Sequence, residues 1–324
     1  MKQRKLGELT VSEIGMGCMG FSHGYGHIPE EEYSIEAIRM AYEYGCTFYD
    51  TAEVYSPNLQ GIGHNERIVG KALLPVRNHV VLATKLFLGT EEAGKKGVYE
   101  TLRHHLEGSM ERLQTDYIDL YYLHHLNPDI PVEEVAEGMG RLIREGVIRA
   151  WGLSNVGVKA IAKAHAVTPV SAVQNIYSMM ERDCEDAILP YCMENGIGVV
   201  PFSPIASGFL SGKITPETKF ESEDDVRNVV PQLSGENVRA NQPLVGILKE
   251  YAAQKQATPA QISLAWMLCK YPHVVPIPGS KNKERILENL GAWEVELTQD
   301  EFAALEEALD SCTVHGHRGC VELE

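Results

Sequence analysis

The sequence is short of positive charge and of long apolar runs, and each shortage argues against a class of protein. Its 324 residues include 29 Lys and Arg against 45 Asp and Glu, so the formal net charge is -16. A surface of this sign repels polyanions. No stretch approaches the run of about 20 apolar residues that a membrane-spanning helix needs. The sequence therefore predicts a protein whose main partner is neither a nucleic acid nor a membrane.

Paired cysteines, a secretory leader and flexible linkers are also lacking. The seven cysteines form no C-x-x-C pair and are odd in number, which favours reduced thiols over a disulfide framework. The basic N-terminal residues are not followed by an apolar segment, as a signal peptide would require. No low-complexity segment or sequence repeat divides the chain. We therefore expect a cytoplasmic protein with one domain over residues 1–324.

Short apolar runs that alternate with amphipathic segments predict an α/β fold. The eight candidate strands are Ser12–Cys18, Thr47–Tyr49, His79–Lys85, Tyr117–His124, Ile148–Leu153, Ser171–Asn175, Gly198–Phe202 and Val274–Pro276. The clearest of them are nearly continuous apolar runs, typical of strands buried on both faces of a parallel sheet. The candidate helices are Pro29–Tyr44, Glu100–Arg112, Val132–Glu145, Gly157–Ala166, Cys184–Asn195, Pro243–Lys255, Pro259–Tyr271, Lys283–Gly291 and Thr298–Ser311.

Eight strands followed by helices favour a single-domain (β/α)8 TIM barrel over a doubly wound open sheet. The barrel would have a long loop after strand 7, roughly over residues 204–258, and a C-terminal helix and tail. Residues 15–20 match G-x-G-x-x-G, but a dinucleotide-binding Rossmann fold needs a helix directly after this motif. The polar and glycine residues of 22–27 delay the helix, so we interpret the motif as a glycine-rich first loop.

Polar side chains stand where three consecutive predicted strands end. These are Asp50, Lys85 and His124, and Tyr55 follows Asp50 by five residues. The C-terminal ends of barrel strands meet at one face, so we expect these side chains to converge. A lysine that ends a buried strand needs a partner such as Asp50. The ammonium of Lys85 would lower the pKa of Tyr55 toward the working range and so make Tyr55 a proton donor. His124 would orient a carbonyl oxygen.

A metal-dependent barrel hydrolase is an alternative from another class. It needs His and Asp ligands clustered at strand ends, and only Asp50 and His124 qualify. Near the C-terminus, His315, His317 and Cys320 lack a clear fourth ligand. We therefore predict no metal site.

Motifs along the whole chain carry a resemblance to a known family. They are Asp50 to Glu53 with Tyr55, Asn65 and Glu66 with Gly70, Lys85 after Ala83 and Thr84, Asp116 to His124, Gly152 to Asn155, Gln174 with Asn175, Phe202 to Pro204, and Ile277 to Ser280. In this order they resemble the aldo-keto reductases, in the bacterial branch related to potassium-channel β-subunits. The resemblance implies an NADPH-dependent reductase that converts small aldehydes or ketones reversibly to alcohols. An alternative is an NADPH-binding, redox-sensing regulatory subunit with poor turnover.

The resemblance implies a catalytic tetrad at the strand ends. Tyr55 would be the general acid, Lys85 and Asp50 would tune it, and His124 would position the carbonyl. His125 is the neighbour to distinguish from His124. Alternation along a strand would place the two side chains on opposite sides, and the family motif assigns the role to His124.

The same resemblance implies NADP(H) bound without a Rossmann fold. The residues that would contact it are Cys18, Met19, Asp50, Ser154, Asn155, Gln174, Phe202, Ser203, Pro204, Ile205, Ser207, Gly208, Lys213, Gly279, Ser280, Lys281, Arg285, Glu288 and Asn289. Among them, Ser154, Asn155 and Gln174 would hold the carboxamide, and Phe202 would stack on the nicotinamide. Lys281 and Arg285 are basic residues in an acidic chain and would suit a 2′-phosphate, which favours NADP over NAD.

The predicted substrate pocket lies around the tetrad and in variable loops. It would be lined by Met19, Phe21, Tyr25, His27, Val54, Tyr55 and His124, with residues of the 205–240 loop. The sequence leaves open the physiological substrate, the preferred direction and whether the chain is a monomer or a homo-oligomer.

Overall fold

Seven parallel strands form a curled sheet around which the chain is built. The computed structural model describes residues 1–57, 61–220, 222 and 225–318. The strands lie side by side in chain order: β3 (Met16–Gly17), β4 (Phe48–Asp50), β5 (Val81–Leu86), β6 (Ile118–Leu123), β7 (Ile148–Ser154), β8 (Ala172–Gln174) and β9 (Gly198–Val199). Because all neighbours are parallel, their C-terminal ends share one edge of the sheet.

Residues 273–279 close this sheet into a barrel. This segment forms a parallel bridge to Val199 of β9 on one side and another to Gly17 of β3 on the other. It contains Pro276 and Pro278, which have no N–H to donate, so it cannot build a regular ladder. The predicted eighth strand is therefore wrong as a strand, although its residues take the eighth place. The predicted (β/α)8 barrel is confirmed.

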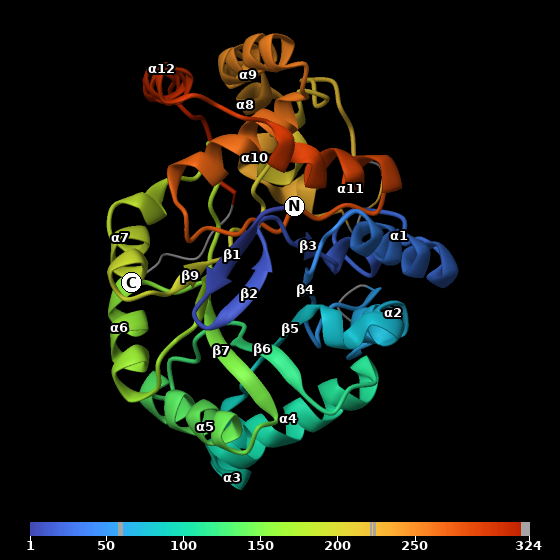
Figure 1. Cartoon of the computed structure of the whole chain (residues 1–324), viewed down its shortest axis with the longest axis vertical. Coiled ribbons are helices and arrows are strands. Elements are labelled where there is room, and N and C mark those ends of the chain that lie inside the picture. The colour runs from blue at the N-terminus through green and yellow to red at the C-terminus, as the bar shows by residue number, and fades with distance from the viewer. Residues whose placement is uncertain (58–60, 221, 223–224, 319–324) are drawn as a thin grey trace.

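Helices surround the barrel as an outer layer (Figure 1). They are α1 (Glu31–Glu43), α2 (His64–Leu73), α3 (Thr90–Lys96), α4 (Val98–Leu113), α5 (Val132–Arg144), α6 (Val158–Val167), α7 (Ile188–Glu194), α8 (Gly235–Ala240), α9 (Gln242–Lys255), α10 (Pro259–Lys270), α11 (Lys283–Leu290) and α12 (Gln299–Asp310). The nine predicted helices are all present, and Thr258 and Thr298 form capping boxes at α10 and α12. The sequence missed α2, α3 and α8, and the helix predicted from Cys184 begins only at Ile188.

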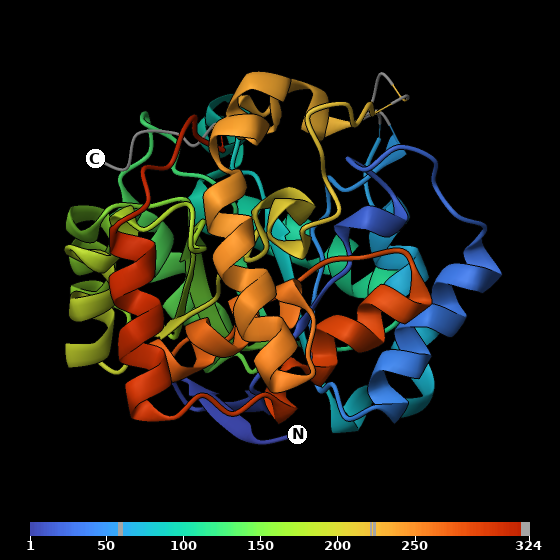
Figure 2. The ribbon, with the colours of Figure 1, turned by 90° about the horizontal axis from the view of Figure 1, so that it is seen from above.

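An N-terminal hairpin closes one end of the barrel. Strands β1 (Gln3–Leu6) and β2 (Leu9–Ser12) pair antiparallel, so the predicted strand Ser12–Cys18 is too long and only its β3 part joins the barrel. Leu6 and Val11 are fully buried among the side chains that fill the barrel. Figure 2 shows the hairpin at one end of the molecule and α8 at the other. The open end, where the strands terminate, is therefore free for a site.

The contact between hairpin and barrel generates a stability prediction. A Cβ on Gly198 would lie 2.3 Å from Leu6 Cδ2 and 2.8 Å from Leu6 Cα, so backbone has to move. We expect Gly198→Ala to reduce the free energy of unfolding by about 1–3 kcal/mol, measured by urea denaturation. Gly94→Ala in α3 is the control, because a Cβ there meets nothing within 4 Å. Equal unfolding free energies for the two variants would contradict the prediction.

Candidate active site

Strands β4 and β5 bring a lysine, an aspartate and a tyrosine together at the open end of the barrel. The Nζ of Lys85 donates to Asp50 Oδ1 at 2.5 Å, to the carbonyl of Thr51 at 2.8 Å and to Tyr55 Oη at 3.2 Å. The Lys85 side chain is fully buried, and three acceptors match its three donors. The other oxygen of Asp50 accepts a hydrogen bond from Gln174 Nε2 at 2.8 Å.

The protonation states of this cluster follow from burial and charge. Burial alone would lower the pKa of Lys85, but Asp50 and Tyr55 together raise it, so an ammonium is held there. Burial raises the pKa of Tyr55, and Lys85 offsets this only in part. The expectation that Lys85 brings the pKa of Tyr55 down toward the working range is therefore wrong, because desolvation of a phenolate outweighs the nearby ammonium. Tyr55 is held as a protonated phenol.

His124 completes the cluster from the end of β6. Its ring lies edge-on to Tyr55, with 5.8 Å between centroids, and its Nδ1 is buried without a hydrogen bond to any described residue. Burial, then Lys85 and His125, lower the pKa of His124 to about 2, so the imidazole is neutral. His125 stacks on it at 5.1 Å and 15°. The predicted alternation is wrong here because β6 ends at Leu123, before both histidines.

A groove of about 300 Å³ runs beside this cluster, between the loop after β9 and the segment before α11. Twelve of the predicted cofactor-binding residues line it: Ser203, Pro204, Ile205, Ser207, Gly208, Lys213, Gly279, Ser280, Lys281, Arg285, Glu288 and Asn289. Ser203, Ala206 and Ser207 have φ of 48–54°, a costly conformation for residues other than glycine. Backbone strain of this kind is typical of a ligand-binding loop.

The cations of the groove differ in how they are paired. Lys281 Nζ donates to the carbonyls of Tyr25, at 2.7 Å, and His27, so it fastens the first loop to the groove. Lys213 lies 3.4 Å from Glu288. Arg285 is exposed, and its guanidinium pairs with no other residue in the part of the chain that the structure describes. Arg285 is therefore the cation most available to an anionic ligand.

The remaining predicted cofactor residues lie outside the groove. Ser154 and Gln174 end β7 and β8, and Asn155 turns back with φ of 54°. The backbone N–H of Phe202 donates to Asn175 at 3.1 Å, which places Phe202 directly before the groove residues. Ser154, Asn155 and Gln174 therefore lie at the C-terminal end of the barrel, and Phe202 directly precedes the groove residues in the chain.

The predicted residues of the first two loops separate into buried and accessible ones. Cys18 and Phe21 are fully buried in the core, so neither forms an open wall. Met19 and Val54 are half-buried. Tyr25, predicted for the substrate pocket, lines the groove instead.

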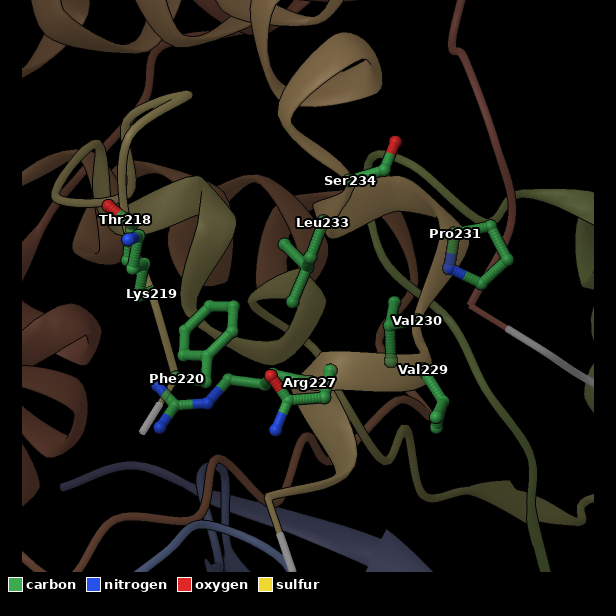
Figure 3. Close-up of a pocket in the computed structure, with 10 residues that line it drawn as sticks. Thr218, Lys219, Phe220, Arg227, Val229, Val230, Pro231, Leu233 and Ser234 are labelled. Atoms are coloured by element: carbon green, nitrogen blue, oxygen red, sulfur yellow. The ribbon is translucent and has the colours of Figure 1, made fainter. Parts of the chain in front are cut away.

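A second hollow of about 480 Å³ lies next to the groove (Figure 3). Phe220 and Arg227 line both hollows, and the guanidinium of Arg227 sits 4.3 Å from the centre of the Phe220 ring. Asp225 holds Arg227 at 2.8 and 2.5 Å. The sequence missed Arg227, which no motif marks. None of the tetrad residues lines either hollow, but the groove is lined by twelve predicted cofactor-binding residues and the second hollow by none of them, so the second hollow is not the candidate cofactor site.

Residues 1–57, 61–220, 222 and 225–318 contain no group of three His, Cys, Asp or Glu side chains that could hold a metal ion. Cys320 of the predicted tail lies outside these described residues. No helix in that part of the chain is long and apolar enough to cross a membrane.

Comparisons with known proteins identify the family of this chain. The model of the Aldo/keto reductase family matches residues 13–310. The chain is 37% identical over 313 residues to a probable aldo-keto reductase 1 of Glycine max, covering 95% of this chain and 88% of that protein. The glycerol dehydrogenase AKR11B4 of Gluconobacter oxydans superposes with a TM-score of 0.84 at 25% identity, over 98% of each chain. An aldo/keto reductase of Klebsiella pneumoniae in complex with NADP and acetate gives 0.74 at 26%, over 99% of this chain and 100% of that one.

The fold and the match define an oxidoreductase that acts on carbonyl and alcohol groups. The chain belongs to the aldo-keto reductase family.

The environment of His124 generates a pH prediction. We expect its ¹⁵N imidazole resonances to stay constant from pH 8 to pH 5, whereas those of His105, whose pKa is raised, move with a midpoint above 6.5. Since the pKa of His124 is lower in the folded than in the unfolded chain, the unfolded chain takes up this proton first. The contribution of His124 to stability is therefore lost as pH falls below about 6.5. A His124 midpoint between pH 5 and pH 7 would refute the neutral assignment.

Proposed function

We propose that the protein is an NADPH-dependent reductase of small aldehydes and ketones, working reversibly, with Tyr55 as the general acid. The observation that carries this proposal is the contact of a protonated Tyr55 with the Lys85 ammonium beside the strained groove. A proton donor next to a cofactor groove is the arrangement that carbonyl reduction requires.

Each residue at the barrel end has its own role in the proposed reaction. Tyr55 donates its proton to the carbonyl oxygen as negative charge develops there, and Lys85, 3.2 Å away, stabilises the phenolate that remains. Asp50 keeps Lys85 charged and in place. His124 is neutral, so it can share a hydrogen bond with the carbonyl oxygen without adding a second charge. In the reverse direction Tyr55 has first to lose its proton to solvent, and the phenolate, stabilised by Lys85, then accepts the proton of an alcohol.

The residues present fit a nicotinamide cofactor. The buried Nδ1 of His124, without a partner among the described residues, and the left-handed backbone at Ser203, Ala206 and Ser207 support a ligand site here. Ser154, Asn155, Gln174 and Phe202 would hold the nicotinamide end, and the groove would hold the phosphates. When bound, NADPH supplies the hydride for the carbonyl carbon. The Klebsiella pneumoniae relative in complex with NADP supports this cofactor class, and the glycerol dehydrogenase relative supports reversibility.

The preference for NADPH over NADH rests on the basic residues at the far end of the groove. Two of the three donors of Lys281 are directed at backbone carbonyls, whereas the five donors of Arg285 are available. A guanidinium can hold a phosphate through two parallel hydrogen bonds. We therefore assign the 2′-phosphate chiefly to Arg285, with Lys281 positioning the loop that covers the groove.

Removing the Tyr55 hydroxyl tests the general acid. We expect Tyr55→Phe to lower kcat by about 10²–10⁴-fold, because only the proton donor is lost. Absorbance at 340 nm over a panel of aldehydes and ketones measures turnover. NADPH fluorescence titration should give an unchanged Kd. Wild-type turnover with none of the panel, or equal turnover by both proteins, would overturn the proposed function.

Removing the Arg285 guanidinium tests cofactor choice. We expect Arg285→Ala to raise KM for NADPH about tenfold or more, since a hydrogen bond to a charged group contributes about 1.5–3 kcal/mol, and to leave KM for NADH unchanged. Lys283→Ala is the matched control, because its Nζ pairs with Glu36 at 2.7 Å away from the groove. An equal rise for both cofactors in Arg285→Ala would refute the phosphate assignment.

A further inference from the structure

The loop that carries Tyr55 is anchored by a buried carboxylate that takes no part in the chemistry above. Glu53 is 2% exposed, and its Oε1 accepts the backbone N–H of Phe87 at 2.9 Å. The ring of Phe87 in turn lies 4.6 Å from that of His124. One carboxylate therefore joins the Tyr55 loop to the residue that packs on His124.

The second oxygen of Glu53 is held by a histidine from α4. His105 Nδ1 lies 2.8 Å from Glu53 Oε2, and His105 Nε2 lies 3.2 Å from Glu92 Oε2. A neutral imidazole can donate from only one nitrogen, so acceptors on both sides require the imidazolium. Consistently, the hydrogen bond to Glu53 is the largest cause that raises the pKa of His105, ahead of an opposing effect of burial.

Other charged or titratable groups surround the pair of His105 and Glu53, and they come from each of the neighbouring elements. They are Lys96 of α3, 2.9 Å from Glu92, Arg112 and His104 of α4, Glu66 of α2, and the buried Tyr121 hydroxyl of β6. Arg112 is committed to Glu66 at 2.5 Å and reaches Glu53 only at 4.0 Å. His105 is therefore the closest cation to Glu53.

We propose that protonated His105 is a positioning residue for the reduction, because its ion pair with Glu53 holds the Tyr55 loop and Phe87 in their working places. The proposal rests on the proposed function. Loss of the proton from His105 removes the positive charge beside the buried Glu53 carboxylate and leaves one N–H for two acceptors, so this anchor is weakened. Because the pKa is raised in the folded chain, the ion pair is complete at low pH and is lost as pH rises through that pKa. We therefore expect turnover to fall as the pH rises through the pKa of His105.

The experiment compares four proteins over pH 6–9.5 with one reactive carbonyl and saturating NADPH. They are the wild type, His105→Gln, Glu92→Gln and the control His104→Gln, whose exposed side chain lies beside His105. We expect the alkaline fall in wild-type kcat to share its midpoint with the ¹⁵N titration of His105. Glu92→Gln should move both midpoints to lower pH, because one of the two carboxylates that raise the pKa is gone. His104→Gln should match the wild type.

His105→Gln separates positioning from folding. We expect kcat at pH 6.5 to fall about tenfold with KM for NADPH within about twofold, and the alkaline fall to disappear, as displaced reacting groups predict. An alkaline fall that persists in His105→Gln would overturn the proposal. So would a His105 titration that does not share the midpoint of kcat, or a Glu92→Gln midpoint equal to that of the wild type. Absence of any wild-type NADPH turnover would refute the proposed function itself, while the ¹⁵N titration would still show whether the ion pair forms.

Discussion

The buried ion pair between Lys85 and Asp50 is the constraint on which the rest of the site depends. Taking two charges out of water is expensive and is repaid only by close geometry with every donor and acceptor satisfied. The parallel register that sets Asp50 opposite Ala83, two residues before Lys85, supplies that geometry. Gln174 reaches the same carboxylate from β8, so the sheet has to curl into a barrel before the pair is complete. The fold and the chemistry are thus two consequences of one arrangement.

The loops that extend the site are held by contacts between their polar side chains and the loop backbone. Asn65 Nδ2 donates to the carbonyl of Cys18 at 2.9 Å, and the Thr51 hydroxyl donates to Asn65 Oδ1 at 2.6 Å, so one amide ties the first loop to the second. Glu66 accepts from Thr84 at 2.6 Å and from Arg112 at 2.5 Å, which fastens α2 to the barrel and to α4. Several motif residues that carry the family resemblance are therefore structural. They are fully buried and hold the loops around Tyr55.

Strand ends could be predicted from the sequence because apolar runs and their polar last residues are local features. Contacts made across the fold could not. Glu53 and His105 are 52 residues apart, and no spacing rule connects them. The direction of the Tyr55 pKa depends on how strongly the folded chain desolvates the phenolate, which the sequence does not give. The apolar residues of the closing segment, 273–279, predict an ordinary strand. Pro276 and Pro278 have no N–H, however, so the segment cannot form the regular hydrogen bonds of a strand.

The net charge of -16 and the affinity proposed for a phosphate are compatible because most cations at the groove already have their donors directed at other groups of the protein. Asp225 holds Arg227, Glu288 pairs with Lys213, and backbone carbonyls take two donors of Lys281. Each of these cations fastens a loop and adds little attraction of its own. Arg285 alone in the groove keeps its donors free among the described residues, at the start of α11, where backbone N–H groups also favour an anion. In the proposed function, selectivity for a single phosphate thus depends on which cation is left unpaired, and the total charge of the chain does not determine it.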